Sequence, residues 1–311
     1  MDRKKTYPMK HITTLFLFCF LPLTLSAEHL FEAGLRAGMA GYDGRCLYVL
    51  PVMNLHAGVQ FSYAYHSPHI IGFRIGATLD CSNAGYYKHA YTDSYSVIDV
   101  ENEPIQVDYN IGRLKEMYTT WSVGIPVQVG LSGKNISFYL GPKIVFPLRC
   151  LWNQTADLAA LSVYFPLQDN RVYNSFPLAA SPSFRETQTG EQTLPKVQYG
   201  LAAELCYDIP VHTGRRTISY LSIGIYLDYL FPSIHNDPSD RISLLMLSDT
   251  REGFPLYRIL TPIVQSQRQG KRLVSTRRPF DFGIKLSFRI APYNPLRRNS
   301  QNCRCYGIYN F

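Results

Sequence analysis

The chain has 311 residues, of which 46% are hydrophobic and 17% charged, and its formal net charge is +8. The basic excess is mild, and the Arg pairs that begin at residues 215, 277 and 297 do not alternate with aromatic residues as in a nucleic-acid interface. No nucleic-acid partner is therefore expected. A mean hydropathy of −0.10 suits a soluble protein, but it also suits a membrane β-barrel, because each barrel strand is only half apolar.

Residues 1–27 have the pattern of a secretory signal peptide. A basic start, "MDRKK", precedes the apolar run "ITTLFLFCFLPLTL", and "LSA" before Glu28 is a plausible cleavage site. The run is shorter than the ~20 apolar residues that a spanning helix needs. Cleavage would remove four basic residues and one acidic residue and lower the formal charge to about +5. We therefore expect an exported chain.

Apolar and polar residues alternate in eight later segments, of which "WSVGIPVQVGL" at 121–131 is the clearest. Successive side chains of a β-strand point to opposite faces, so a period of two predicts strands. Pro142 and Pro147 make the fifth segment the weakest. The predicted strands span residues 31–39, 55–63, 71–79, 121–131, 136–146, 197–209, 221–229 and 280–290.

The second face of these strands is rich in glycine and carries a few well-spaced charges. A β-sandwich would place Thr, Lys and Glu there, whereas a narrow closed interior needs small residues and balanced charge. Six acids on this face nearly match five bases. The sequence therefore predicts a closed antiparallel transmembrane β-barrel with a charge network that plugs the lumen, formed by Glu32, Arg36, Arg74, Lys143, Glu204, Asp208, Asp228, Lys285 and Arg289.

The connections between the predicted strands alternate between long and short. Short turns are expected around "HSPH", "SGK" and "VHTGRR", and long loops over 41–53, 81–115, 149–195 and 232–279. This is the plan of outer-membrane barrels, with short periplasmic turns and long extracellular loops. Aromatic residues near the strand ends fit interfacial girdles: Tyr63, Tyr65, Trp121, Tyr207, Tyr229 and Phe231.

Two consecutive segments resemble a known family. "SVGIPVQVGL" followed by "FYLGPKIVFPL" is similar to the "YLEIPLLLK" strand and the following GP-containing strand of the outer-membrane β-barrel domain family that includes PorT-like proteins of the type IX secretion system. The resemblance implies a cell outer-membrane location, and it transfers no functional residue. It also implies a possible role as a secretion or assembly factor.

An interior of eight strands is filled by side chains, so the sequence predicts a membrane anchor whose long surface loops bind a protein partner or serve a structural role. The other expected partners are outer-membrane lipid and the barrel assembly machinery. A small-solute channel and a lipid-modifying enzyme at the rim are alternatives. An enzyme is not expected, because His66, His69, His89 and His235 lack the His-x-Ser pairing of barrel deacylases.

No catalytic, cofactor or metal site is predicted. Cys303 and Cys305 lack the usual two-residue spacer and a second ligand pair for zinc. The six cysteines after the signal set no disulfide framework.

The expected organisation is a signal peptide at 1–27, the barrel at 28–291 and a periplasmic tail at 292–311. The tail ends on Phe311, and such a terminal aromatic residue resembles a barrel-assembly signal. "IQVDYN" and "RILTPIVQ" leave ten strands as an alternative to eight.

Overall fold

A computed structural model describes residues 28–46, 48–66, 71–98, 103–133, 135–173, 184–213, 217–231, 244–248, 257–268 and 271–292. Eight strands form one ring in the order β4-β3-β2-β1-β14-β9-β8-β5, and β5 pairs back with β4. Each pairing in the ring is antiparallel. The strands are β1 (Glu28–Asp43), β2 (Leu50–His66), β3 (Ile71–Ile98), β4 (Pro104–Ser132), β5 (Ile136–Phe165), β8 (Gln198–Thr213), β9 (Thr217–Leu230) and β14 (Arg278–Pro292).

The ring confirms the predicted barrel of eight strands. Each predicted segment lies within one of the eight strands, apart from Val197, which precedes β8. The two prolines of the fifth segment are accommodated inside β5. The register with β4 shifts at Pro147. Trp121 pairs with Arg149 and Ser122 with Pro147, which leaves Leu148 as the extra residue of a β-bulge.

The outer surface of the barrel is apolar. Along β4 the outward residues between Trp121 and Leu131 are all apolar, and Val129 and Leu131 are 63% and 57% exposed. Burying one such side chain is worth about 1.5–3 kcal/mol, so a continuous belt of them is unfavourable in water. These eleven residues, in a strand tilted by about 45°, cover roughly 25 Å, the height of the apolar band of a membrane barrel. The belt therefore has the chemistry and the height of a lipid-facing surface.

Exposed and half-buried aromatic side chains border this belt at both ends. Tyr63 and Tyr207 lie near the short-turn end, and Trp121, Tyr229 and Phe231 near the long-loop end. Trp and Tyr combine an apolar ring with a polar tip and favour the membrane–water interface. Their positions fit the girdles expected from the sequence.

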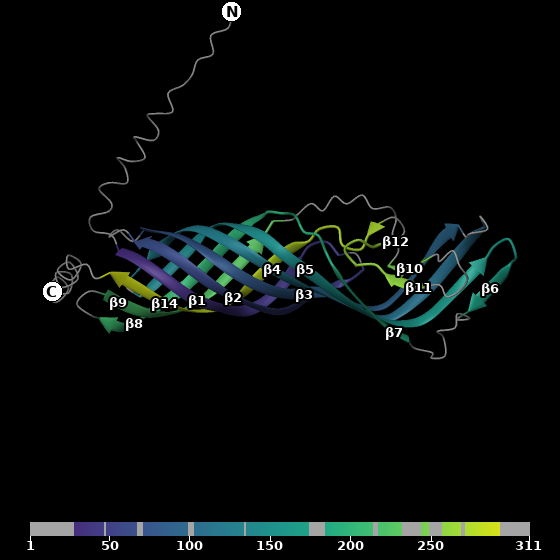
Figure 1. Cartoon of the computed structure of the whole chain (residues 1–311), viewed down its shortest axis with the longest axis horizontal. Helices are drawn as coiled ribbons and strands as arrows, with labels where there is room; N and C mark the ends of the chain where they lie inside the picture. The colour runs from purple at the N-terminus through teal and green to yellow at the C-terminus, as the bar shows by residue number, and fades with distance from the viewer. Residues whose placement is uncertain are drawn as a thin grey trace, which may run out of the picture.

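Three strands continue far beyond the belt as an arm, formed by residues 82–98 of β3, 104–120 of β4 and 149–165 of β5. Figure 1 shows these strands leaving the barrel together. β6 (Asn170–Tyr173) and β7 (Phe184–Glu191) both pair with β5 and widen the sheet. The sequence expectation of loops over 81–115 and 149–195 is wrong for most of these residues, because strand pairing continues where the lipid-facing alternation stops.

The outer face of the arm is polar, unlike that of the barrel. Arg113 and Arg185 both approach Asp157, with nitrogen–oxygen distances of 3.8 and 2.9 Å, and Arg149 lies 3.4 Å from Glu191. These side chains suit water rather than lipid. The exterior therefore changes from apolar to charged along the same three strands.

The inner face of the arm carries the main hydrophobic core and is covered by a cap, defined as the described residues 257–268 and 271–277 between β9 and β14. Tyr86, Tyr118 and Leu114 of the arm are fully buried, together with Ile263 and Leu273 of the cap. The cap contains β11 (Tyr257–Leu260), β12 (Gln267–Arg268) and β13 (Lys271–Arg272), and β11 pairs with β10 (Leu245–Ser248). It lies beside the point where the arm leaves the barrel (Figure 1).

The ten-strand alternative is wrong. "IQVDYN" at 105–110 lies inside β4, and "RILTPIVQ" at 258–265 begins in β11, which pairs with β10 outside the barrel. The predicted signal peptide and Cys303, Cys305 and Phe311 of the predicted tail lie outside the described residues. Among the residues that are described, no helix is long and apolar enough to cross a membrane.

Candidate functional site: the charged barrel interior

The inner face of the barrel strands is polar and almost completely buried. The nine residues predicted to form a network all lie on it, and Arg74 and Lys285 are 0% exposed. Glycines make room for them, because a Cβ atom at Gly124 would lie 2.3 Å from Cε of Lys143, and one at Gly58 would lie 2.2 Å from Oδ1 of Asp80. The glycine-rich face is therefore what lets long charged side chains cross a narrow interior.

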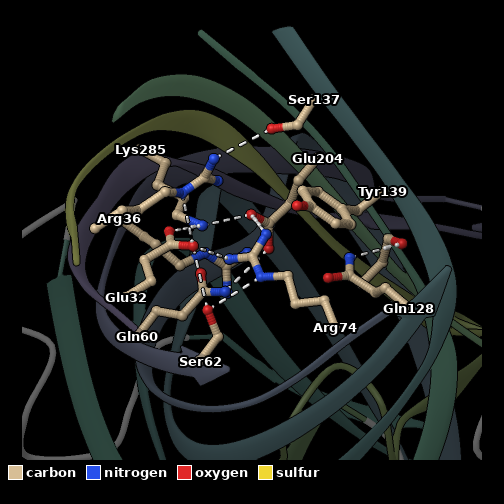
Figure 2. A network of polar contacts seen from close by, with 12 residues as sticks. Glu32, Arg36, Gln60, Ser62, Arg74, Gln128, Ser137, Tyr139, Glu204 and Lys285 are labelled. Carbon is tan, nitrogen blue, oxygen red and sulfur yellow. Dashed lines mark hydrogen bonds and ion pairs between the residues drawn. The ribbon is translucent and has the colours of Figure 1, made fainter. Parts of the chain in front are cut away.

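Glu204 of β8 is the centre of the layer nearer the short turns (Figure 2). Its Oε2 atom accepts hydrogen bonds from Nη1 of Arg74 at 2.7 Å and from Nζ of Lys285 at 2.6 Å. Its Oε1 atom accepts one from Nε2 of Gln60 at 3.1 Å. One carboxylate thus contacts side chains of β2, β3 and β14, and none of these strands pairs with β8, whose sheet neighbours are β5 and β9.

Glu32 and Asp208 complete this layer. Nε of Arg289 lies 3.1 Å from Oε2 of Glu32, and its Nη1 donates to both carboxylate oxygens of Asp208 at 2.7 Å. Arg74 and Lys285 also contact Glu32. Three acids and three bases lie within this layer, so its charges balance.

A second layer lies nearer the long connections and contains Arg36, Asp80, Lys143 and Asp228. Arg36 pairs with Asp80 at 3.3 Å and with Asp228, while Nζ of Lys143 lies 3.0 Å from Asp80 and 2.7 Å from Asp228. The guanidinium of Arg36 also stacks over the ring of Tyr226, 3.9 Å from its centroid. Every base in this layer contacts both carboxylates.

The strand alternation places Asp80, His56, Gln60, Ser62 and Tyr139 on the inner face, but the predicted network did not include them. Ser62 donates to Glu32 at 3.2 Å, and Arg74 stacks over Tyr139 with 5.0 Å to the ring centroid. All of these residues share the parity of the inner face in their strands. Strand parity therefore located these residues, but not their contacts.

The network occupies the interior of the barrel at the level of the two layers. Charged groups in a low-dielectric interior are tolerated only when paired and hydrogen bonded, and the ten charged residues of the two layers are five acids and five bases. Pairs across the ring hold opposite walls together.

The histidines considered as catalytic candidates have other contacts. His66 forms hydrogen bonds with the hydroxyl of Tyr139 through Nε2 and with Oγ of Ser132 through Nδ1 at 3.3 Å. His89 lies in the arm, with Nδ1 3.0 Å from the hydroxyl of Tyr87. His69 and His235 lie outside the described residues.

A buried carboxylate fastens the cap to the arm. Glu116 is 0% exposed and accepts hydrogen bonds from the backbone N–H of Ile263 at 2.9 and 3.1 Å, from Nε2 of Gln154 at 2.7 Å and from the hydroxyl of Tyr118. Gln154 also donates to the carbonyl of Thr261 at 3.2 Å. Burial raises the pKa of Glu116 to about 7, against the opposing effect of its hydrogen bonds and of the charge of Arg277.

No family model matches the sequence, and no curated protein matches it. A similar solved structure is that of Ail, the attachment invasion locus protein of Yersinia pestis, in complex with the heparin analogue sucrose octasulfate. The alignment covers 85% of this chain and 98% of that one, with 10% identity and a TM-score of 0.23. This similarity assigns neither a family nor a function to the chain.

Proposed function

We propose that this protein is an outer-membrane β-barrel that acts as an anchor and presents its arm and cap at the cell surface for binding or for a structural role. The observation that carries the proposal is the change of the exterior along β4, from apolar at residues 121–131 to polar at Lys115 and Arg113. Only the first stretch suits lipid, so the arm must stand in water.

The plugged interior supports an anchor rather than a channel. Ten paired charges occupy the lumen, and an eight-stranded barrel has little further room. The outside location of the arm follows from the plan of such barrels, in which the short turns face the periplasm.

Two experiments test this proposal. The protein should fractionate with outer membranes and migrate differently on gels before and after boiling, as folded small barrels do. An epitope tag inserted at 174–183, between β6 and β7, should be detected on intact cells, while a tag at 214–216, between β8 and β9, should need permeabilisation. Recovery in the soluble periplasm without a shift, or the reverse tag pattern, would contradict the proposal.

A secretion or assembly role of the PorT type is a second candidate. It is supported by the two segments that resemble that family, which lie in β4 and β5. A deletion strain should then lose secreted proteins from the medium. If the secreted proteins are unchanged and only surface binding is lost, the anchor role is favoured.

A further inference from the structure

A cavity of about 270 Å³ lies at the mouth of the barrel, between the second charge layer and the cap. Asp80, Asp228 and Lys143 form its floor together with Asp281, and residues such as Arg277 and Val274 of the cap form its roof. The cavity is therefore bounded by the network on one side and by a separate segment of the chain on the other.

Three carboxylates and one lysine line the floor of this cavity, and two further bases, Arg272 and Arg277, line it on the side of the cap. Arg36 and Lys143 compensate Asp80 and Asp228, but Asp281 has no ion pair with a lysine or arginine among the described residues. Its nearest recorded partner is Nε2 of His56 at 4.0 Å, and that atom also lies 3.5 Å from Asp80 without forming a hydrogen bond. Among the described residues, Asp281 is therefore the one carboxylate of the floor without a lysine or arginine partner.

The walls of the cavity offer polar groups that other described residues do not use. Gln198 and Ser122 line it, and they are 8% and 9% exposed. In the described part of the chain, neither side chain has a hydrogen-bond partner. Both side chains face the cavity, so they can hydrogen bond to a molecule there that has hydroxyl or amide groups of its own.

We propose that the mouth cavity binds a small organic cation, with its ammonium group against Asp281 and a hydroxyl-bearing body against Gln198 and Ser122. An ammonium group would give Asp281 a cationic partner, and a charge-assisted hydrogen bond to a carboxylate is among the stronger polar contacts. This binding goes beyond the anchor role and does not depend on it.

Glucosamine is a suitable probe, because glucose and N-acetylglucosamine have the same ring without a free amine. Calorimetric titration of the full-length folded barrel in detergent, at a pH where the amine is protonated, should show glucosamine binding at least about tenfold more tightly than either control sugar. No measurable binding of glucosamine, or equal binding of all three sugars, would overturn the proposal.

Two variants locate the site. Asp281→Asn should weaken glucosamine binding about tenfold or more, while Asp43→Asn, at an exposed carboxylate of the same barrel end that does not line the cavity, should leave it unchanged. Heat-modifiable migration shows whether each variant is folded.

If Asp281→Asn does not fold, Gln198→Leu provides the test and should weaken binding severalfold. Unaltered binding in a folded Asp281→Asn or Gln198→Leu protein would overturn the proposal.

Discussion

Nη1 of Arg74 in β3 lies 2.7 Å from Oε2 of Glu204 in β8, and the two side chains are 1–2% exposed. Neither strand pairs with the other, since β4 and β5 separate them on one side of the ring. The contact therefore spans the interior and ties together walls that no backbone hydrogen bond connects. Lys285 contacts the same carboxylate oxygen at 2.6 Å, so loss of this carboxylate would leave two buried cations short of a partner.

Glu204→Gln should lower the free energy of unfolding by about 3–5 kcal/mol, because removing one partner of a buried ion network leaves uncompensated charge. Urea unfolding of the barrel in lipid vesicles, followed by tryptophan fluorescence, measures this. Glu191→Gln is the matched control, since Glu191 lies on the outer face of the arm with 59% of its side chain exposed. Equal stability of the two variants would show that the network does not hold the barrel together.

Gly124→Val should also destabilise the barrel, by about 3 kcal/mol or more. The new side chain would meet Cε of Lys143 at 2.3 Å and Oγ1 of Thr78 at 2.6 Å, and it would displace the ammonium group from Asp80 and Asp228. Gly112→Val is the control, because the nearest atom to a Cβ there is 3.7 Å away. The same unfolding assay compares the two variants. If Gly124→Val leaves the free energy of unfolding unchanged, the side chain of Lys143 can move away from Asp80 and Asp228 without loss of stability.

Val127→Arg tests the lipid-facing belt. Val127 lies outward near the middle of residues 121–131, and an arginine at the bilayer midplane of a barrel costs about 2–4 kcal/mol. Thr119→Arg, further along the outward face of the same strand in the arm, should change stability by less than about 1 kcal/mol. Similar costs at the two positions, measured by folding into vesicles, would contradict the proposed membrane boundary.

The contact between the arm and the cap should weaken as pH rises. The pKa of Glu116 is raised to about 7 in the folded protein from 4.5, so the folded state binds more protons than the unfolded state between those values. Stability of the capped state is then highest below about pH 4.5, falls up to about pH 7 and is flat above it. Hydrogen exchange at the amide of Ile263, corrected for its intrinsic pH dependence, reports this.

The control for this prediction is Glu116→Gln, which keeps an acceptor for the N–H of Ile263 but cannot titrate. Its protection should be constant across the same pH range. If the protein with Glu116 shows the same constant protection, the carboxylate does not control the contact between arm and cap.

How much of the interior was predictable can be seen at Arg74 and Asp80. Both lie at even positions of a strand whose odd positions are apolar, so their burial inside a closed barrel followed from the sequence. That Arg74 pairs with Glu204 and Asp80 with Lys143 did not follow, because partners across the lumen depend on the register of all eight strands. For the same reason, the sequence did not predict that Asp281 has no lysine or arginine partner among the described residues.

The sequence by itself determined the eight strands and the face on which each residue lies, because a side-chain period of two assigns faces wherever one face is apolar. The arm was decided only by the tertiary structure. Its outer face is charged at Arg113 and Asp157, and its inner face is covered by Ile263 and Leu273 from a distant part of the chain. Neither face keeps the lipid-facing alternation, so a local pattern could not distinguish these strands from loops.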